Sequence, residues 1–285
     1  MSKYDKSFYS KILLAGEYTV MTDGNAIAFP YKRFEGRFEF DEGKSSASLY
    51  DLLYYLQQNQ LDIYIDVEKL RSDLALGMYF KSNIPYGYGL GSSGALVAAL
   101  YNRYGKNKAK NTDELRRILG ELESVFHGTS SGMDPLVSYL DQPVVFTGNQ
   151  IKLIHQDSLN LSGFFLIDTG IDRSTSYYVE IFNNMKKNLA QYGKKIKKLE
   201  SINRQLIQAI LKNHNAEIAI HMEVLSRLQY DIFTDMIPDG FKNIWLKGLE
   251  SGNYFLKLCG AGGGGMILGW SPGIDLDLGC TVLYL

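Results

Sequence analysis

The feature that most constrains the fold of this chain is a glycine-rich stretch at residues 84–94, which reads Ile-Pro-Tyr-Gly-Tyr-Gly-Leu-Gly-Ser-Ser-Gly. A strand-like segment at residues 75–83 precedes it, and small apolar residues follow it at 95–100 in a pattern typical of a closely packed helix. Repeated glycines destabilise the interior of a regular element, so they predict a tight turn. We therefore expect a strand, a glycine turn and a helix that begins at Ser92 and Ser93.

The rest of the hydrophobic pattern mixes helices and strands without strict alternation. Apolar residues at helical spacing predict helices at 113–126, 133–140, 178–189, 196–210 and 218–225. Strand patterns occur at 11–21, 143–146, 163–168, 254–258, 266–270 and 281–285. This mixture fits an α+β fold better than a doubly wound parallel sheet. The least structured stretch, 148–162, suggests two domains, at residues 1–157 and 158–285.

Composition and charge exclude several classes of protein. With 45% hydrophobic residues among 285, the chain is a globular protein rather than a disordered one. Its 30 basic and 31 acidic residues give a net charge of −1 and no long basic stripe, so we expect no nucleic-acid partner. The two cysteines match no metal-ligand spacing. The N-terminus has no apolar signal and no apolar run reaches about 18–20 residues, which predicts a cytoplasmic protein without a membrane partner.

The glycine turn has the chemistry of an anion site. Residues 89–94 match Gly-x-Gly-x-x-Gly, but no acidic residue ends a following strand as a dinucleotide site requires, and no Gly-Lys-Ser/Thr completes a P-loop. Glycines still let backbone N–H groups approach a phosphate, and the positive end of the helix favours an anion there. The hydroxyls of Ser92 and Ser93 can bind phosphate oxygens or Mg²⁺. The alternative is a plain strand-to-helix turn with Ser92 as the N-cap.

Three motifs together resemble the GHMP kinases, the superfamily of galactokinase, homoserine kinase, mevalonate kinase and phosphomevalonate kinase. Residues 85–94, with their Gly-Leu-Gly-Ser-Ser core, resemble the phosphate-binding motif of that family. Residues 11–18 (Lys-Ile-Leu-Leu-Ala-Gly-Glu-Tyr) resemble its N-terminal motif. Residues 257–265 (Lys-Leu-Cys-Gly-Ala-Gly-Gly-Gly-Gly) resemble its C-terminal motif. The motifs occur in the family's order over nearly the whole chain.

The resemblance implies a fold, cofactors and a nucleotide site. It implies the α+β GHMP kinase fold, with an N-terminal ribosomal-protein-S5-like domain, a C-terminal ferredoxin-like domain and the active site between them. The cofactors would be ATP and Mg²⁺, and the second substrate a small-molecule alcohol. The residues implied for ATP binding are Pro85, Gly87, Tyr88, Gly89, Leu90, Gly91, Ser92, Ser93 and Gly94.

A further segment is most similar to the mevalonate kinases within this family. Residues 121–134 carry a glutamate, then His-Gly, then Ser-Gly-x-Asp, which is similar to their pattern. By this resemblance Asp134 is the catalytic base, Lys11 stabilises the alkoxide beside it, and Ser93 and Glu123 hold Mg²⁺. Residues 168–175 resemble a strand and an Arg-Ser-Thr turn of the same enzymes. The residues implied for acceptor binding are Glu17, Tyr18, Gly260, Ala261, Gly262, Arg173 and Thr175.

Two departures from the pattern keep alternatives open. Thr129-Ser130-Ser131 stands where mevalonate kinases usually carry a proline before Ser-Gly, and Tyr18 replaces a histidine. Gly-Glu-Tyr also occurs in phosphomevalonate kinases. We therefore expect phosphorylation of mevalonate to 5-phosphomevalonate, in isoprenoid precursor biosynthesis. The alternatives are phosphorylation of phosphomevalonate or a sugar, or an inactive relative that binds ATP or a metabolite. The oligomeric state is left open, with a homodimer as one option.

The site residues also have plain structural interpretations. Ser131-x-x-Asp134 resembles a capping box, so Asp134 could serve only as a helix cap. Lys11 could be a solvated lysine at the start of a strand, and Glu123 a surface residue. These interpretations predict exposed side chains or a capping bond, and the structure can separate them from the functional ones.

Overall fold

The computed structural model describes residues 6–22, 24–44, 46–148, 150–172, 175–273 and 276–285. Its backbone contacts divide the chain into two compact units, each made of separate stretches. The first unit comprises residues 1–11, 29–85 and 91–142, and the second comprises residues 12–28, 86–90 and 143–285. Strands β1 (Phe8–Ala15) and β2 (Ala26–Phe40) run through both units. The domain boundary after residue 157 stays a prediction.

The first unit packs helices beside a strand pair. The second half of β2 pairs antiparallel with β3 (Met78–Ser82), in a register that sets Phe38 opposite Phe80. The helices are α1 (Ala47–Gln58), α2 (Val67–Ala75), α3 (Ser92–Tyr104), α4 (Thr112–His127) and α5 (Met133–Leu140), with a short 3₁₀ helix, η2 (Leu61–Ile63). Helix α3 contacts both α4 and α5. Its buried face is rich in alanine, which lets these helices approach closely.

The second unit holds a complete small sheet. Strands β6 (Phe164–Asp168), β7 (Phe255–Leu258), β8 (Met266–Trp270) and β9 (Val282–Tyr284) form it in the order β7-β8-β6-β9. Every neighbouring pair is antiparallel. Counted along the chain, this order is 2-3-1-4, which is the strand order of a ferredoxin-like sheet. The predicted C-terminal architecture is therefore present.

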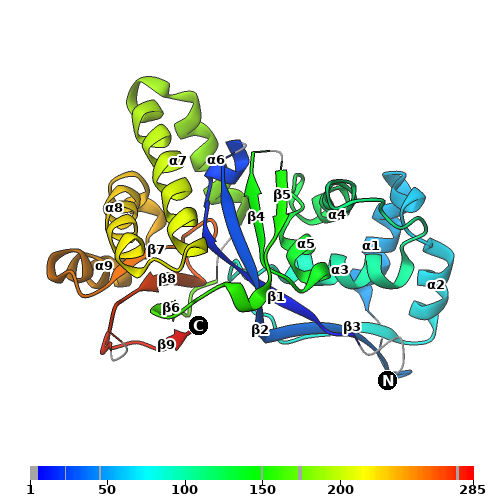
Figure 1. Cartoon of the computed structure of the whole chain (residues 1–285). Helices are drawn as coiled ribbons and strands as arrows, with labels where there is room; N and C mark the ends of the chain where they lie inside the picture. Colours follow the sequence, from blue (N-terminus) through cyan, green and yellow to red (C-terminus); the bar gives the residue numbers. More distant parts are fainter. Residues whose placement is uncertain (1–5, 23, 45, 149, 173–174, 274–275) are drawn as a thin grey trace. The chain divides into compact units, whose positions relative to one another are not determined.

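Helices and a second strand group complete this unit. Helices α6 (Thr175–Lys187), α7 (Leu189–Leu211), α8 (Asn215–Phe233) and α9 (Asp239–Ser251) precede β7. Figure 1 shows α7 and α8 side by side, and α8 and α9 both contact β7. Strands β4 (Val144–Thr147) and β5 (Gln150–Leu153) pair with each other, and β4 pairs with the start of β2. The 3₁₀ helices are η1 (Thr19–Thr22), η3 (Gln156–Ser158) and η4 (Thr234–Met236).

The structure corrects the predicted strand at residues 11–21. Strand β1 ends at Ala15, and residues 19–22 form η1 instead. Gly16 has a φ of +110° and Tyr18 a φ of +63°, so the backbone leaves the extended region there. A Cβ on Gly16 would lie 2.4 Å from the Cβ of Ala26, and this close approach requires glycine. The stretch 148–162, predicted as the least structured, contains β5 and η3.

The helices of the described residues are amphipathic and bury their apolar faces. Of the six apolar positions predicted in α4, 115, 118, 119 and 122 are buried, whereas Val125 is half-buried and Phe126 is exposed. Helices α7 and α8 bury Leu199, Leu206, Met222 and Leu225 in the same way. Within the described part of the chain, no helix has both the length and the apolar character that a membrane crossing requires.

Candidate active site

Five side chains of the first unit gather where α3, α4 and α5 contact one another, and we call them the carboxylate cluster: Lys11, Ser93, Glu123, Ser130 and Asp134. Lys11 Nζ lies 3.1 Å from Asp134 Oδ2. Ser93 Oγ donates to Glu123 Oε1 at 3.0 Å, and Ser130 Oγ donates to Glu123 Oε2. The four residues predicted for catalysis and metal binding thus lie in one cluster, together with a serine that was not predicted.

The structure contradicts the plain interpretations of these residues. The N-cap of α5 is Gly132, in a left-handed conformation, rather than Ser131, so the capping box Ser131-x-x-Asp134 does not form. Lys11 is 5% exposed and Glu123 is 4% exposed, which is incompatible with solvated surface residues. Buried charges of this kind need partners, and the cluster supplies them.

Asp134 lies in the first turn of α5, where the helix dipole favours a carboxylate. Its side chain is 31% exposed, whereas that of its partner Lys11 is 6% exposed. The cation is therefore sequestered while the carboxylate can meet a molecule that arrives from solvent. This geometry suits a base that is oriented by a buried ammonium group.

Glu123 carries the strongest electrostatic perturbation of the cluster. Burial, followed by the negative charge of Asp134, raises the pKa of Glu123 to about 7. The hydrogen bonds from Ser130 and Ser93 and the charge of Lys11 act in the opposite direction. A divalent cation beside this carboxylate would stabilise its charged form.

The donor set of the cluster fits Mg²⁺. A carboxylate and a hydroxyl are hard oxygen ligands, and Mg²⁺ commonly takes only one or two protein ligands together with phosphates and water. Across the described residues no group of three or more His, Cys, Asp or Glu forms a closed metal cage. Glu123 and Ser93 therefore fit a metal shared with a nucleotide better than a metal held by protein alone.

The N-terminus of α3 faces this cluster. Gly91 is its N-cap with a φ of +75°, and a Cβ there would lie 3.0 Å from Lys11 Cγ and 3.5 Å from Asp134 Oδ2. The alternative that Ser92 is the N-cap is wrong, because Ser92 is the first residue of the helix. The open N–H groups of this helix end, next to the Lys11–Asp134 pair, have the chemistry that would favour an anion.

The other residues predicted for ATP binding differ in their surroundings. Gly94 is buried against α5, since a Cβ there would lie 2.9 Å from the Asp134 carbonyl carbon. Leu90 is buried, and Pro85, Gly87 and Gly89 are partly exposed in the turn. Tyr88 belongs to the second unit, where burial and then the charges of Asp168 and Asp172 raise its pKa.

The residues predicted for the acceptor belong to the second unit, and Glu17 and Tyr18 are buried there by contacts with one segment. Lys257 Nζ donates to Glu17 Oε1 and, at 2.7 Å, to the Leu258 carbonyl oxygen. Neither side chain of this ion pair is exposed. Tyr18 donates its hydroxyl to the Ala261 carbonyl oxygen, and its ring centroid lies 4.5 Å from that of Phe182. Glu17 and Tyr18 therefore bind the segment 257–261.

Residues 260–265, which we call the glycine loop, are held by backbone bonds within the same unit. Gly265 N–H donates to the Ile171 carbonyl oxygen at 2.7 Å, and Gly263 N–H donates to that of Met236. A Cβ on Gly263 would overlap the Tyr178 ring, and the φ of +79° also favours glycine at this position. Gly260 is partly exposed, whereas Ala261 and Gly262 are buried. Arg173 and the side chain of Thr175 lie outside the described residues.

Sequence reasoning missed Ser130 and Lys257. Lys257 is part of the C-terminal motif and interrupts the apolar run Tyr-Phe-Leu-Lys-Leu-Cys, which signals a buried charge that needs a partner. No such signal marks Ser130, because its contact with Glu123 depends on how the loop before α5 lies on α4.

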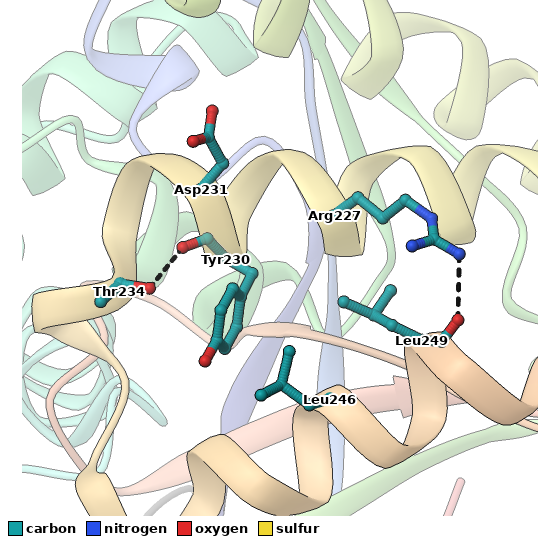
Figure 2. A pocket seen from close by; sticks show the side chains of 6 residues that line it. All are labelled: Arg227, Tyr230, Asp231, Thr234, Leu246 and Leu249. Carbon is teal, nitrogen blue, oxygen red and sulfur yellow. Dashed lines mark hydrogen bonds between the residues drawn. The ribbon is translucent and has the colours of Figure 1, made fainter.

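A surface hollow of about 530 Å³ lies between α8 and α9, and Figure 2 shows the six residues that line it. Two of their polar side chains bind backbone oxygens, since Thr234 donates to Tyr230 at 2.6 Å and Arg227 donates to Leu249 at 2.9 Å. None of the residues predicted for the site lines this hollow.

Comparison with known proteins supports the resemblance of the motifs. Residues 53–142 match the family described as the GHMP kinases N terminal domain. The chain is 23% identical over 273 residues to a mevalonate kinase of Pyrococcus abyssi (strain GE5 / Orsay), an alignment that covers 93% of this chain and 77% of the relative.

Solved structures show the same fold. L. major mevalonate kinase in complex with R-mevalonate has a TM-score of 0.63 at 19% identity, covering 94% of this chain and 86% of that one. Streptococcus pneumoniae phosphomevalonate kinase in complex with phosphomevalonate and AMPPNP has a TM-score of 0.66 at 15% identity, covering 94% and 92%. These likenesses confirm the predicted α+β architecture.

Proposed function

We propose that this chain, which has the GHMP kinase fold and the N-terminal domain of that family, is an ATP-dependent small-molecule kinase. The acceptor we propose is mevalonate, giving 5-phosphomevalonate for isoprenoid precursor biosynthesis. The observation that carries this proposal is the carboxylate cluster, in which Lys11 pairs with Asp134 beside the buried Glu123. Mevalonate kinases among the relatives support the choice of acceptor.

The cluster supplies what phosphoryl transfer requires, which is positioning and neutralisation of charge rather than covalent chemistry. Asp134 accepts the proton of the attacking hydroxyl, and Lys11 orients Asp134 and stabilises the developing alkoxide. The N-terminus of α3 binds phosphate oxygens through its N–H groups. Ser93 and Glu123 would hold Mg²⁺, which neutralises phosphate charge when it is bound.

The acceptor side belongs to the proposal as well. Gly260, Ala261 and Gly262, with Arg173 and Thr175, are proposed to shape the acceptor pocket. Glu17 and Tyr18 take part by holding the segment 257–261, because their side chains are buried against it.

Two other functions are the alternatives. Phosphomevalonate as the acceptor is favoured by Gly16-Glu17-Tyr18 and by the fold shared with the S. pneumoniae enzyme. An inactive sensor would need no base, yet Asp134 keeps both its solvent access and its lysine partner. That arrangement favours an active kinase.

The test is a coupled assay of ADP release with ATP and Mg²⁺ over four acceptors, namely mevalonate, phosphomevalonate, homoserine and galactose. We expect turnover with mevalonate above all others. ADP release that depends on a different acceptor would replace the proposed substrate but keep the kinase. Binding of ATP without turnover of any acceptor would favour the sensor.

A further inference from the structure

Ser130 is the member of the carboxylate cluster to which the proposed function assigns no role. It lies in the loop between α4 and α5, where its hydroxyl donates to Glu123 Oε2 and accepts from Gly132 N–H at 2.9 Å. Ser93 donates to the other oxygen of the same carboxylate, Oε1, at 3.0 Å. Two hydroxyls from two different segments therefore hold the two oxygens of Glu123.

The loop is built to bring Ser130 to Glu123. A Cβ on Gly132 would lie 2.2 Å from the Arg116 carbonyl oxygen, and one on Gly120 would lie 3.2 Å from the Gly132 nitrogen. Both glycines thus permit the loop to lie directly on α4. The hydroxyl of the next residue, Ser131, accepts a hydrogen bond from Met133 N–H at 3.3 Å.

This arrangement matters when Ser93 binds a metal. The terminal torsion of a glutamate is broad, so the carboxylate plane needs external hydrogen bonds to stay fixed. If the Ser93 oxygen turns to a cation, its bond to Oε1 weakens, whereas the Ser130 bond to Oε2 can remain. Because Ser130 also accepts from Gly132 N–H, it links Glu123 to the residue that caps α5, the helix of Asp134.

We propose that Ser130 is a positioning residue, which fixes the Glu123 carboxylate for a divalent cation and ties it to the N-terminus of α5. The inference rests on the proposed function, since it takes Glu123 as a metal ligand. It also concerns the stretch in which this chain departs from the mevalonate kinase pattern. Partners of metal ligands typically change metal affinity about 10–100-fold when they are removed.

The test measures metal binding without turnover. Binding of Mn²⁺ to the full chain saturated with AMPPNP is followed by the loss of the free Mn²⁺ signal in electron paramagnetic resonance. We expect Ser130→Ala to weaken Mn²⁺ binding by about tenfold. Ser130→Cys keeps the size but donates weakly, so it should show a similar loss, whereas Ser130→Thr keeps the hydroxyl and should restore binding.

Ser131→Ala is the matched control, because it removes a neighbouring hydroxyl that does not contact Glu123. It should leave Mn²⁺ affinity unchanged, and all variants should bind AMPPNP equally in EDTA. Wild-type affinity in Ser130→Ala and Ser130→Cys, or an equal loss in Ser131→Ala, would overturn the inference alone. A wild-type chain that binds neither AMPPNP nor Mn²⁺ would overturn the proposed function and the inference together.

Discussion

At the scale of single residues, a substitution of Asp134 can distinguish a chemical role from a structural one. Its carboxylate is partly exposed and does not cap α5, so replacement by asparagine removes the base while it leaves the helix intact. We expect Asp134→Asn to lower kcat by about 10²–10⁴-fold or more, since that is the range of general-base catalysis. ATP affinity should stay within a few-fold. Rates from ADP release and a separate ATP titration measure the two effects, and near-normal turnover would show that Asp134 is not the base.

The raised pKa of Glu123 makes stability depend on pH in a defined direction. Between its ordinary value of 4.5 and its folded value of about 7, the folded chain binds more protons at Glu123 than the unfolded chain. Stability from this group is therefore present below pH 4.5 and is lost as pH rises through 7. We expect a loss on the order of 3 kcal/mol in the absence of divalent cations.

Glu123→Gln isolates this effect, because glutamine does not titrate. Urea unfolding of both proteins at pH 5, 6, 7 and 8 gives the difference in their free energies of unfolding. As pH rises, the free energy of unfolding of the wild-type chain should fall relative to that of Glu123→Gln. A constant difference would mean that Glu123 has an ordinary pKa.

Substitutions in the buried pair Glu17–Lys257 test whether these two side chains act by stabilising the packed fold. Lys257→Met leaves a carboxylate buried without its partner and should cost about 3–5 kcal/mol of stability. The double change Glu17→Leu with Lys257→Met removes both charges and should recover most of that loss. Chemical denaturation of both variants measures this. A double variant no more stable than the single one would show that the pair is not the cause.

At the scale of elements, the packing of α3 on α5 fixes the position of Asp134. A Cβ on Gly94 would lie 2.9 Å from both the Asp134 carbonyl carbon and the Pro135 nitrogen, and backbone atoms cannot give way as a side chain can. We expect Gly94→Ala to cost about 1–3 kcal/mol and to lower kcat as Asp134 moves. Thermal unfolding and ADP release measure both effects.

Gly193 provides the matched control in α7. The nearest atom to a Cβ there is Leu189 Cβ at 3.7 Å, which is ordinary contact. Gly193→Ala should therefore stabilise the chain by about 0.4–1 kcal/mol through helix propensity and reduced freedom of the unfolded chain. Equal effects of the two alanines would refute the packing argument.

The same scale shows what the sequence could predict. Periodicity located α4 and α5, and the apolar run that ends at Trp270 located β8, because each element buries one face or both. The end of β1 was mispredicted, because the chain leaves the extended region at Gly16, where it approaches Ala26 closely, and this contact is not visible in the local pattern. The contact of Ser130 with Glu123 likewise depends on tertiary packing, which no local pattern encodes. The resemblance to the family motifs predicted the other members of the carboxylate cluster.

At the scale of the whole molecule, charge decides between the two related acceptors. Phosphomevalonate carries about two more negative charges than mevalonate, and a site normally neutralises them with arginine or lysine. The net charge of the chain is −1, so no general positive field compensates. Within the motifs assigned to the acceptor side, Lys11 is bound to Asp134 and Lys257 to the buried Glu17.

Arg173, which lies outside the described residues, is the remaining basic residue of these motifs in the sequence, and we propose it as the partner of the single carboxylate of mevalonate. We therefore expect kcat/KM for mevalonate to exceed that for phosphomevalonate by at least about tenfold, a difference of ~1.4 kcal/mol in transition-state binding. Steady-state rates with both acceptors at fixed ATP and Mg²⁺ measure this ratio. Arg173→Gln should raise the KM for mevalonate, because its carboxylate loses a charged partner. Equal efficiencies, or a preference for phosphomevalonate, would require a second basic group at the acceptor site and would reassign the substrate.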